Sequence, residues 1–168
     1  MSPTGHLGIG FAVKRLDAKI PLWVYLVGAY VIDLIYMGLS FFKIERFGYN
    51  PWSHSILMAI LWSVVAGLFA FNIVKHKSSA LLMCFVVFSH WILDFIVWDQ
   101  LPLAFGSTMI PGLGFYRRIG FDILSPGINM GSMMATIIEL GMLVIGILIY
   151  WTSKKKSRKY VPIHRTEG

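Results

Sequence analysis

Charged residues are scarce in this chain, and cysteine is almost absent. Only 14% of the 168 residues are charged and 57% are hydrophobic, whereas an ordinary soluble domain carries about 25% charged residues. So little polar surface cannot cover a water-soluble globule. The single cysteine, Cys84, excludes an internal disulfide framework and leaves the redox compartment open. The first residues also lack the charged and apolar blocks of a secretory signal peptide, so we expect the first apolar segments to be retained.

Long apolar runs are present instead. A helix needs roughly 20 mostly apolar residues to cross a bilayer, and four runs reach that length: 20–42, 55–74, 79–98 and 133–151. The sequence therefore predicts an all-α integral membrane protein, a bundle of four transmembrane helices within a single membrane domain, residues 1–151.

A shorter apolar piece, Gly5 to Val13, precedes the first run and is followed by Lys14-Arg15. It is too short to cross a membrane, so we expect an N-terminal half-helix that dips in from the cytoplasmic side and is sheltered by the bundle. His6 is eight residues from Lys14, a helical rise of roughly 12 Å. We therefore expect His6 to lie within the membrane.

The net charge of +7 comes mainly from a basic tail, residues 152–168, directly after the last run. Lys and Arg accumulate on the cytoplasmic side of short loops, so this placement predicts cytoplasmic N- and C-termini and no nucleic-acid partner. We expect the tail to be disordered and to touch anionic lipid headgroups. The same topology leaves four basic residues on the outer side: Lys43, Arg46, Arg117 and Arg118.

Residues 99–132 differ from the runs on either side. They mix glycine and proline with large apolar residues, which is too apolar for a free linker. Long loops in compact domains are often lids or binding loops. We expect an outer Gly/Pro-rich lid loop over the mouth of the bundle.

Ionisable residues occur within the apolar runs, where each costs several kcal/mol unless it is paired. His90 and Asp94 are four residues apart on one helix face and can bind one metal ion together. A His–Asp hydrogen bond between helices is the alternative for this pair. Ser53 is the expected N-cap of the second span, which places His54 in its first turn. Asp33 lies at a similar depth in the outer half.

Four ligand-type residues from three helices at one depth predict a divalent-metal site with one or two ions, and the ligand types favour Zn²⁺. Glu139 lies in the fourth run and needs a partner, for which Arg117, Arg118 or a second metal ion are the candidates. The two arginines could instead hold a substrate phosphate or anchor to lipid headgroups.

Four short segments together resemble a known family: Thr4-Gly5-His6, Ile32-Asp33, Trp52-Ser53-His54-Ser55 and Ser89-His90-Trp91-Ile92-Leu93-Asp94. They are similar to the predicted membrane-bound metal-dependent hydrolases of bacteria, which include a LexA-regulated inner-membrane branch. The resemblance implies a bacterial inner-membrane location, and the depth of the ligand-type residues predicts a site toward the outer face.

The ligand order is more remotely similar to that of zinc phospholipase C and P1-type nucleases. This likeness implies Asp33, His54, His90 and Asp94 around one metal, with His6 joining Asp94 at a second, and Asp33 orienting the attacking water. Relatives carry a further histidine after the third motif, where this chain has Trp98 and Gln100. A complete three-metal site is therefore not expected.

Three functions follow from these patterns. The favoured one is a metal-dependent hydrolase of a lipid-linked ester or phosphoester, with catalytic roles for Asp33 and Glu139 and a metal-activated water. The alternatives are a small transporter with an intramembrane proton or ion path, and a non-catalytic membrane scaffold. The sequence leaves the substrate headgroup and the oligomeric state open.

Overall fold

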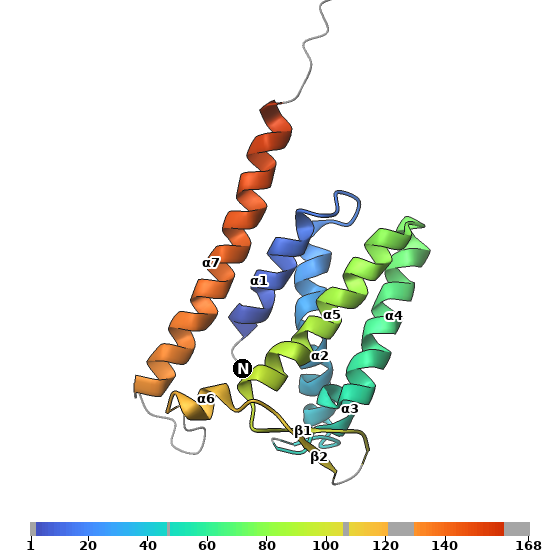
Figure 1. The fold of residues 1–168 in the computed structure, drawn as a ribbon. Helices are drawn as coiled ribbons and strands as arrows, with labels where there is room; N and C mark the ends of the chain where they lie inside the picture. The colour runs from blue at the N-terminus through green and yellow to red at the C-terminus, as the bar shows by residue number, and fades with distance from the viewer. Residues whose placement is uncertain (1–2, 47, 106–107, 121–129, 160–168) are drawn as a thin grey trace, which may run out of the picture.

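A computed structural model describes residues 3–46, 48–105, 108–120 and 130–159, with the backbone alone for Pro3 and 153–159 (Figure 1). The expected all-α class is confirmed for this part of the chain, which adds one small β-hairpin. The elements are α1 (Pro3–Lys14), α2 (Leu22–Phe41), α3 (Pro51–His54), α4 (Ile56–Val74), α5 (Lys77–Val97), β1 (Gln100–Pro102), β2 (Met109–Pro111), α6 (Phe115–Arg118) and α7 (Met130–Lys159).

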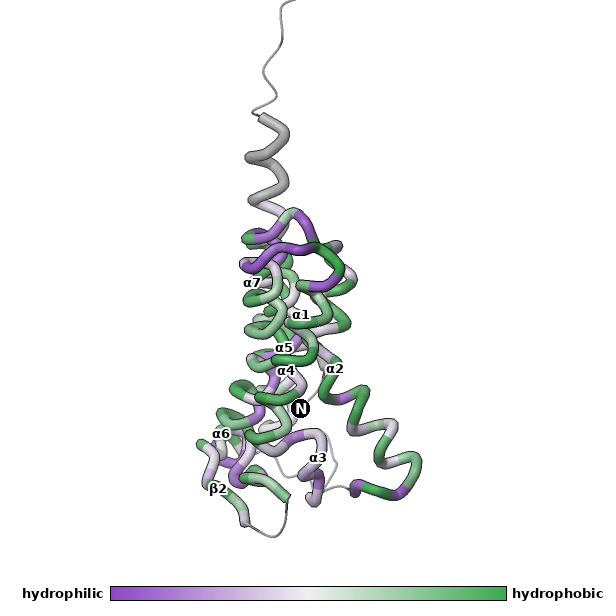
Figure 2. Tube along the Cα trace, turned by 90° about the vertical axis from the view of Figure 1, so that its right-hand side faces the viewer, coloured by the Kyte–Doolittle hydropathy of each residue, from purple (hydrophilic) through white to green (hydrophobic). Residues whose placement is uncertain are grey.

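Helices α2, α4, α5 and α7 are long and apolar enough to cross a membrane, by length and composition. Their bounds follow the four predicted runs, and α2 begins directly after Pro21, which lacks the N–H that a helix interior needs. Large apolar side chains such as Phe69 and Leu148 remain exposed on the outside. Figure 2 shows that hydrophobic residues dominate along these helices. Such an exterior suits a hydrocarbon surrounding better than water.

The predicted half-helix is observed as α1, which lies between α7 on one side and α2 and α5 on the other (Figure 1). Helix α4 packs along α5. The α1–α2 turn and the α4–α5 turn lie at one end of the bundle, whereas α3, α6 and the hairpin lie at the other. Helix α1 is therefore an internal element that brings its N-terminal residues into the middle of the fold.

Two glycines allow α1 to approach α7 closely. A Cβ atom on Gly8 would lie 2.5 Å from the carbonyl oxygen of Met142, and a Cβ atom on Gly146 would run into the backbone of Gly8. Small residues at helix crossings let the two backbones approach, which maximises packing contacts where water gives no driving force.

A network of hydrogen bonds fixes the turn between α1 and α2. The Lys14 ammonium donates to the carbonyl oxygens of Asp17 and Ile20, both at 2.7 Å. The Asp17 carboxylate accepts from the Tyr25 hydroxyl at 2.7 Å and from the backbone N–H of Lys19 at 2.8 Å. Burial alone would raise the pKa of Asp17, but these hydrogen bonds outweigh it and hold the pKa below its usual value. The turn is thereby tied to the first turn of α2.

The segment expected as a lid loop contains regular structure in its described part. Strands β1 and β2 pair antiparallel, with Leu101 opposite Ile110. The hairpin is joined to the bundle because the N–H of Leu113 donates to the carbonyl oxygen of Phe95 at 2.8 Å. Residues 106–107 and 121–129 of the predicted loop lie outside the described residues. Three-residue strands that include proline give no readable alternation, so the sequence did not indicate them.

Helix α7 continues beyond the predicted end of the fourth span. It reaches Lys159 instead of residue 151, so the first part of the predicted disordered tail is helical. Lysine and arginine are good helix formers, and they extend a helix that has already begun. Residues 160–168 of the tail lie outside the described part of the chain.

The α1–α7 crossing makes a testable prediction. Gly146→Ala should destabilise the protein by about 1–3 kcal/mol, because the added methyl group meets the backbone of Gly8. The matched control is Gly141→Ala on the same helix, where a Cβ atom meets nothing within 4 Å, and alanine should be neutral or stabilise by up to about 1 kcal/mol. Thermal unfolding in detergent measures both. Equal effects at the two positions would contradict the close crossing.

Candidate metal centre

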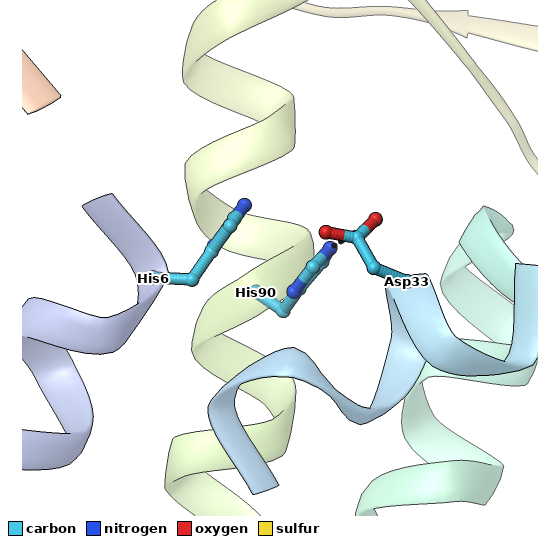
Figure 3. A group of neighbouring side chains, drawn as sticks. All are labelled: His6, Asp33 and His90. Carbon is cyan, nitrogen blue, oxygen red and sulfur yellow. Dashed lines mark ion pairs between the residues drawn. The ribbon is translucent and has the colours of Figure 1, made fainter. Parts of the chain in front are cut away.

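Five side chains that the sequence singled out as ligands lie together in the structure. They are His6 from α1, Asp33 from α2, His54 from α3, and His90 and Asp94 from α5. Figure 3 shows three of them, with His6, His90 and Asp33 reaching toward one region from three different helices. Four of the side chains are 1–9% exposed, and only Asp33 is more accessible, at 20%. We call this group the His/Asp cluster.

The ring nitrogens of two histidines face carboxylate oxygens at closely similar distances. Nε2 of His54 lies 3.3 Å from Oδ1 of Asp33 and 3.6 Å from Oδ2 of Asp94. Nε2 of His90 lies 3.5 Å and 3.4 Å from the same two atoms. Two ligand atoms each bound at about 2.0–2.2 Å to a tetrahedral zinc ion are separated by about 3.3–3.6 Å. These nitrogen–oxygen distances are therefore close to those of a zinc-binding set.

His6 completes the cluster from the α1 side. Its ring stacks on that of His90 with centroids 3.8 Å apart and planes 6° apart, and its Nε2 lies 4.0 Å from Oδ1 of Asp94. Ligand atoms of His6, Asp33 and His90 lie within 4.8 Å of one another, and so do those of His54, His90 and Asp94. The two sets share His90, and its Nε2 can bind only one ion, so an ion held by one set excludes a second ion that uses the same nitrogen in the other set.

The backbone sets the orientation of the His90 ring. His90 and Asp94 project from one face of α5 because they are four residues apart. Nδ1 of His90 lies 3.0 Å from the carbonyl oxygen of Ala29, and a carbonyl only accepts, so Nδ1 carries the hydrogen. In the neutral imidazole, Nε2 then presents its lone pair to the cluster.

Several buried polar atoms of the cluster lack a hydrogen-bond partner among the described residues. They are both ring nitrogens of His6, Nε2 of His90 and Oδ2 of Asp94. A buried polar atom without a partner costs about 1–3 kcal/mol. A divalent cation would accept a lone pair from one nitrogen of each ring and from the Asp94 oxygen, and imidazole and carboxylate are the ligand types that zinc takes. The donor set therefore fits a divalent metal ion.

The local structure around His54 differs from the prediction. Ser53 was expected to cap the second span, but Ser55 does so, because its Oγ accepts from the N–H of Met58 at 3.3 Å. Residues 51–54 form the separate helix α3, which starts at a proline. The Ser53 hydroxyl instead donates to Oε2 of Glu45 at 2.6 Å. His54 is thus the last residue of α3 and lies just before the span.

The structure places Glu139 with different partners from those expected. Its buried carboxylate accepts hydrogen bonds from Oγ1 of Thr4 at 2.9 Å and from the Tyr116 hydroxyl. Burial and this hydrogen bond raise the pKa of Tyr116 well above its usual value. Glu139 belongs to neither set of possible ligands within the described residues. It joins the start of α1 and helix α6 to α7.

The two arginines of α6 lie apart from this network. Arg117 pairs with Asp99 at 2.9 Å and is 82% exposed, and Arg118 is also exposed. Among the described residues, neither forms an ion pair with Glu139 or with the His/Asp cluster. The pairing of Glu139 with Arg117 or Arg118 is therefore not observed.

Sequence reasoning missed two polar residues beside the cluster, Glu45 and Tyr116. Both are buried, yet both come from segments that the sequence assigned to outer loops. One signal was available for Glu45: acidic residues are rare, with eight in the whole chain. No comparable signal marked Tyr116, because the chain has seven tyrosines.

Replacement of Tyr116 and Arg117 separates the buried network from the surface pair. Tyr116→Phe should destabilise the protein by about 1–3 kcal/mol, because it removes a donor from a buried carboxylate. Arg117→Ala should cost about 1 kcal/mol or less, because an exposed ion pair is worth little. Unfolding in detergent compares the two variants, and a larger loss for Arg117→Ala would contradict the assignment of partners.

No family model, curated protein or solved structure was found to match this chain. The family resemblance of its motifs accordingly stays an expectation from the sequence.

Proposed function

We propose that this protein is a membrane-embedded, metal-dependent hydrolase that cleaves a lipid-linked phosphoester with an activated water. The observation that carries the proposal is the buried His/Asp cluster, in which three imidazoles and two carboxylates from four helices converge. Ionisable groups in an apolar bundle are costly unless they have a partner, and they often mark functional sites. A Zn²⁺ ion held by these groups would remove that cost.

When bound, the cation supplies Lewis acidity, which makes a water molecule a competent nucleophile near neutral pH and stabilises negative charge on a phosphoryl oxygen. The protein's own residues have distinct roles. All five side chains of the His/Asp cluster would hold the cation, with Asp33 binding through Oδ1. Asp33 is the most exposed member, and its Oδ1 faces Nε2 of both His54 and His90. Its Oδ2 orients the water and accepts a proton from it.

Glu139 has an indirect role in this proposal. Its carboxylate holds Thr4, which is two residues before His6 at the start of α1. The hydrogen bond therefore positions the helix that supplies one ligand. Glu139 acts as a positioning residue, in place of the catalytic role that the sequence indicated.

We further propose that the chain lies in the bacterial inner membrane, with both termini in the cytoplasm and the cluster toward the outer face. Support comes from the basic residues at the end of the bundle that carries the α1–α2 and α4–α5 turns, since such residues favour the cytoplasmic side. They are Lys14, Arg15, Lys19, Lys75 and Lys77. A lipid-linked substrate would reach the cluster from the bilayer that surrounds the apolar helices.

Metal analysis of detergent-purified protein tests the proposal. Wild-type protein should contain stoichiometric zinc and turn over phospholipid esters, whereas His90→Ala and Asp94→Asn should lose both, because each removes a ligand of the His/Asp cluster. His76→Ala is the matched control, since His76 contacts Ser79 at the opposite end of the bundle. It should retain zinc and turnover.

Folded wild-type protein that binds no divalent ion would contradict the proposal. If such protein moved protons across liposome membranes, the transporter alternative would be favoured. Zinc binding without turnover of any phosphoester would favour the scaffold alternative.

A further inference from the structure

We infer that Glu45 is a positioning residue that fixes the ring tautomer of His54, through the hydroxyl of Ser53, so that Nε2 is available as a ligand. The inference rests on the proposed metal-dependent function, because the tautomer matters there for metal binding. It adds two residues, Glu45 and Ser53, to the site.

Glu45 is held in one orientation by the backbone. The carboxylate is buried, and its Oε1 accepts from the N–H groups of Trp52 at 2.6 Å and Ser53 at 3.0 Å. Its Oε2 accepts from the Ser53 hydroxyl at 2.6 Å. Three donors on one buried carboxylate leave it no freedom to rotate, so Oε2 faces Ser53.

The direction of the next hydrogen bond follows from counting hydrogens. A serine hydroxyl has a single hydrogen, and that of Ser53 is given to Glu45. The 2.7 Å contact between Ser53 Oγ and His54 Nδ1 must therefore have Nδ1–H as its donor. In the neutral ring, Nε2 then carries a lone pair and faces Asp33 and Asp94 at 3.3 and 3.6 Å.

His90 shows the same arrangement by another route, since its Nδ1 donates to the carbonyl oxygen of Ala29. Both histidines thus have Nδ1 bonded outside the cluster and Nε2 within it. Partners of this kind set the tautomer and raise the basicity of a ligating histidine, and their removal typically costs about 10–100-fold in metal affinity.

Glu45→Gln gives the sharpest test, because it keeps the shape of the side chain and reverses the direction of its hydrogen bond with the Ser53 hydroxyl. The amide oxygen is needed for the N–H groups of Trp52 and Ser53, so the amide NH₂ must face the Ser53 hydroxyl. Ser53 then accepts from Gln and donates to Nδ1 of His54. This moves the ring hydrogen to Nε2 and blocks the ligand atom.

The experiment combines two measurements on wild type, Glu45→Gln, Ser53→Ala and the control Ser63→Ala. Ser63 is also buried, but among the described residues its hydroxyl bonds only to the carbonyl oxygen of Ala59. Nitrogen-15 NMR of metal-free protein at alkaline pH reports the His54 tautomer, and chelator competition reports zinc affinity.

We expect the Nδ1–H tautomer in wild type and Ser63→Ala, the Nε2–H tautomer in Glu45→Gln, and a mixture in Ser53→Ala. Zinc affinity should fall about 10–100-fold in Glu45→Gln and by less in Ser53→Ala. If Glu45 only stabilised the fold, Ser53→Ala would lower zinc affinity more than Glu45→Gln, because Gln keeps the backbone hydrogen bonds that Glu45 accepts.

An unchanged His54 tautomer in Glu45→Gln, or zinc affinity equal to wild type in both variants, would overturn the inference. Failure of the proposed function looks different, because wild type itself would then bind no zinc. The tautomer measurement needs no metal and still decides the role of Glu45 in that case.

Discussion

The constraint on which this structure depends is the cost of burying ionisable side chains among apolar helices. Three imidazoles and two carboxylates meet where almost no water reaches them, and every lone pair or hydrogen there needs a partner. The protein itself supplies partners for Nδ1 of His54 and Nδ1 of His90, through the Ser53 hydroxyl and the Ala29 carbonyl. The inward atoms are left facing one another, and a shared cation would satisfy them together.

Much of the unusual architecture serves to bring α1 into this position. The helix is too short to span a membrane, yet it supplies His6 to the cluster. It is held along its length by the glycine crossing with α7, at its end by the hydrogen bonds around Asp17, and at its start by Thr4 on Glu139. Together these contacts fix one imidazole beside His90.

The sequence could predict the parts of the site that depend on helical geometry. The length of the apolar runs predicted the four long helices. The four-residue spacing of His90 and Asp94 predicted that both lie on one helix face. The similar depth of Asp33 in its helix indicated that it lies near this pair. The sequence could not choose between Ser53 and Ser55 as the helix cap, because both flank His54 and both suit the role. Glu45 decides the choice, and only the tertiary fold brings it to Ser53. Glu139 is a second example. It accepts a hydrogen bond from Tyr116, whereas the next residue, Arg117, pairs with Asp99. Opposite charge alone would have paired Glu139 with Arg117.

The central claim is that the five side chains surround a common cation, and zinc K-edge X-ray absorption of the purified protein tests it most directly. The account predicts a first shell of nitrogen and oxygen atoms at about 2.0–2.2 Å, with the outer-shell scattering of imidazole rings. A shell containing sulfur at about 2.3 Å, one without imidazole scattering, or protein without zinc would contradict it.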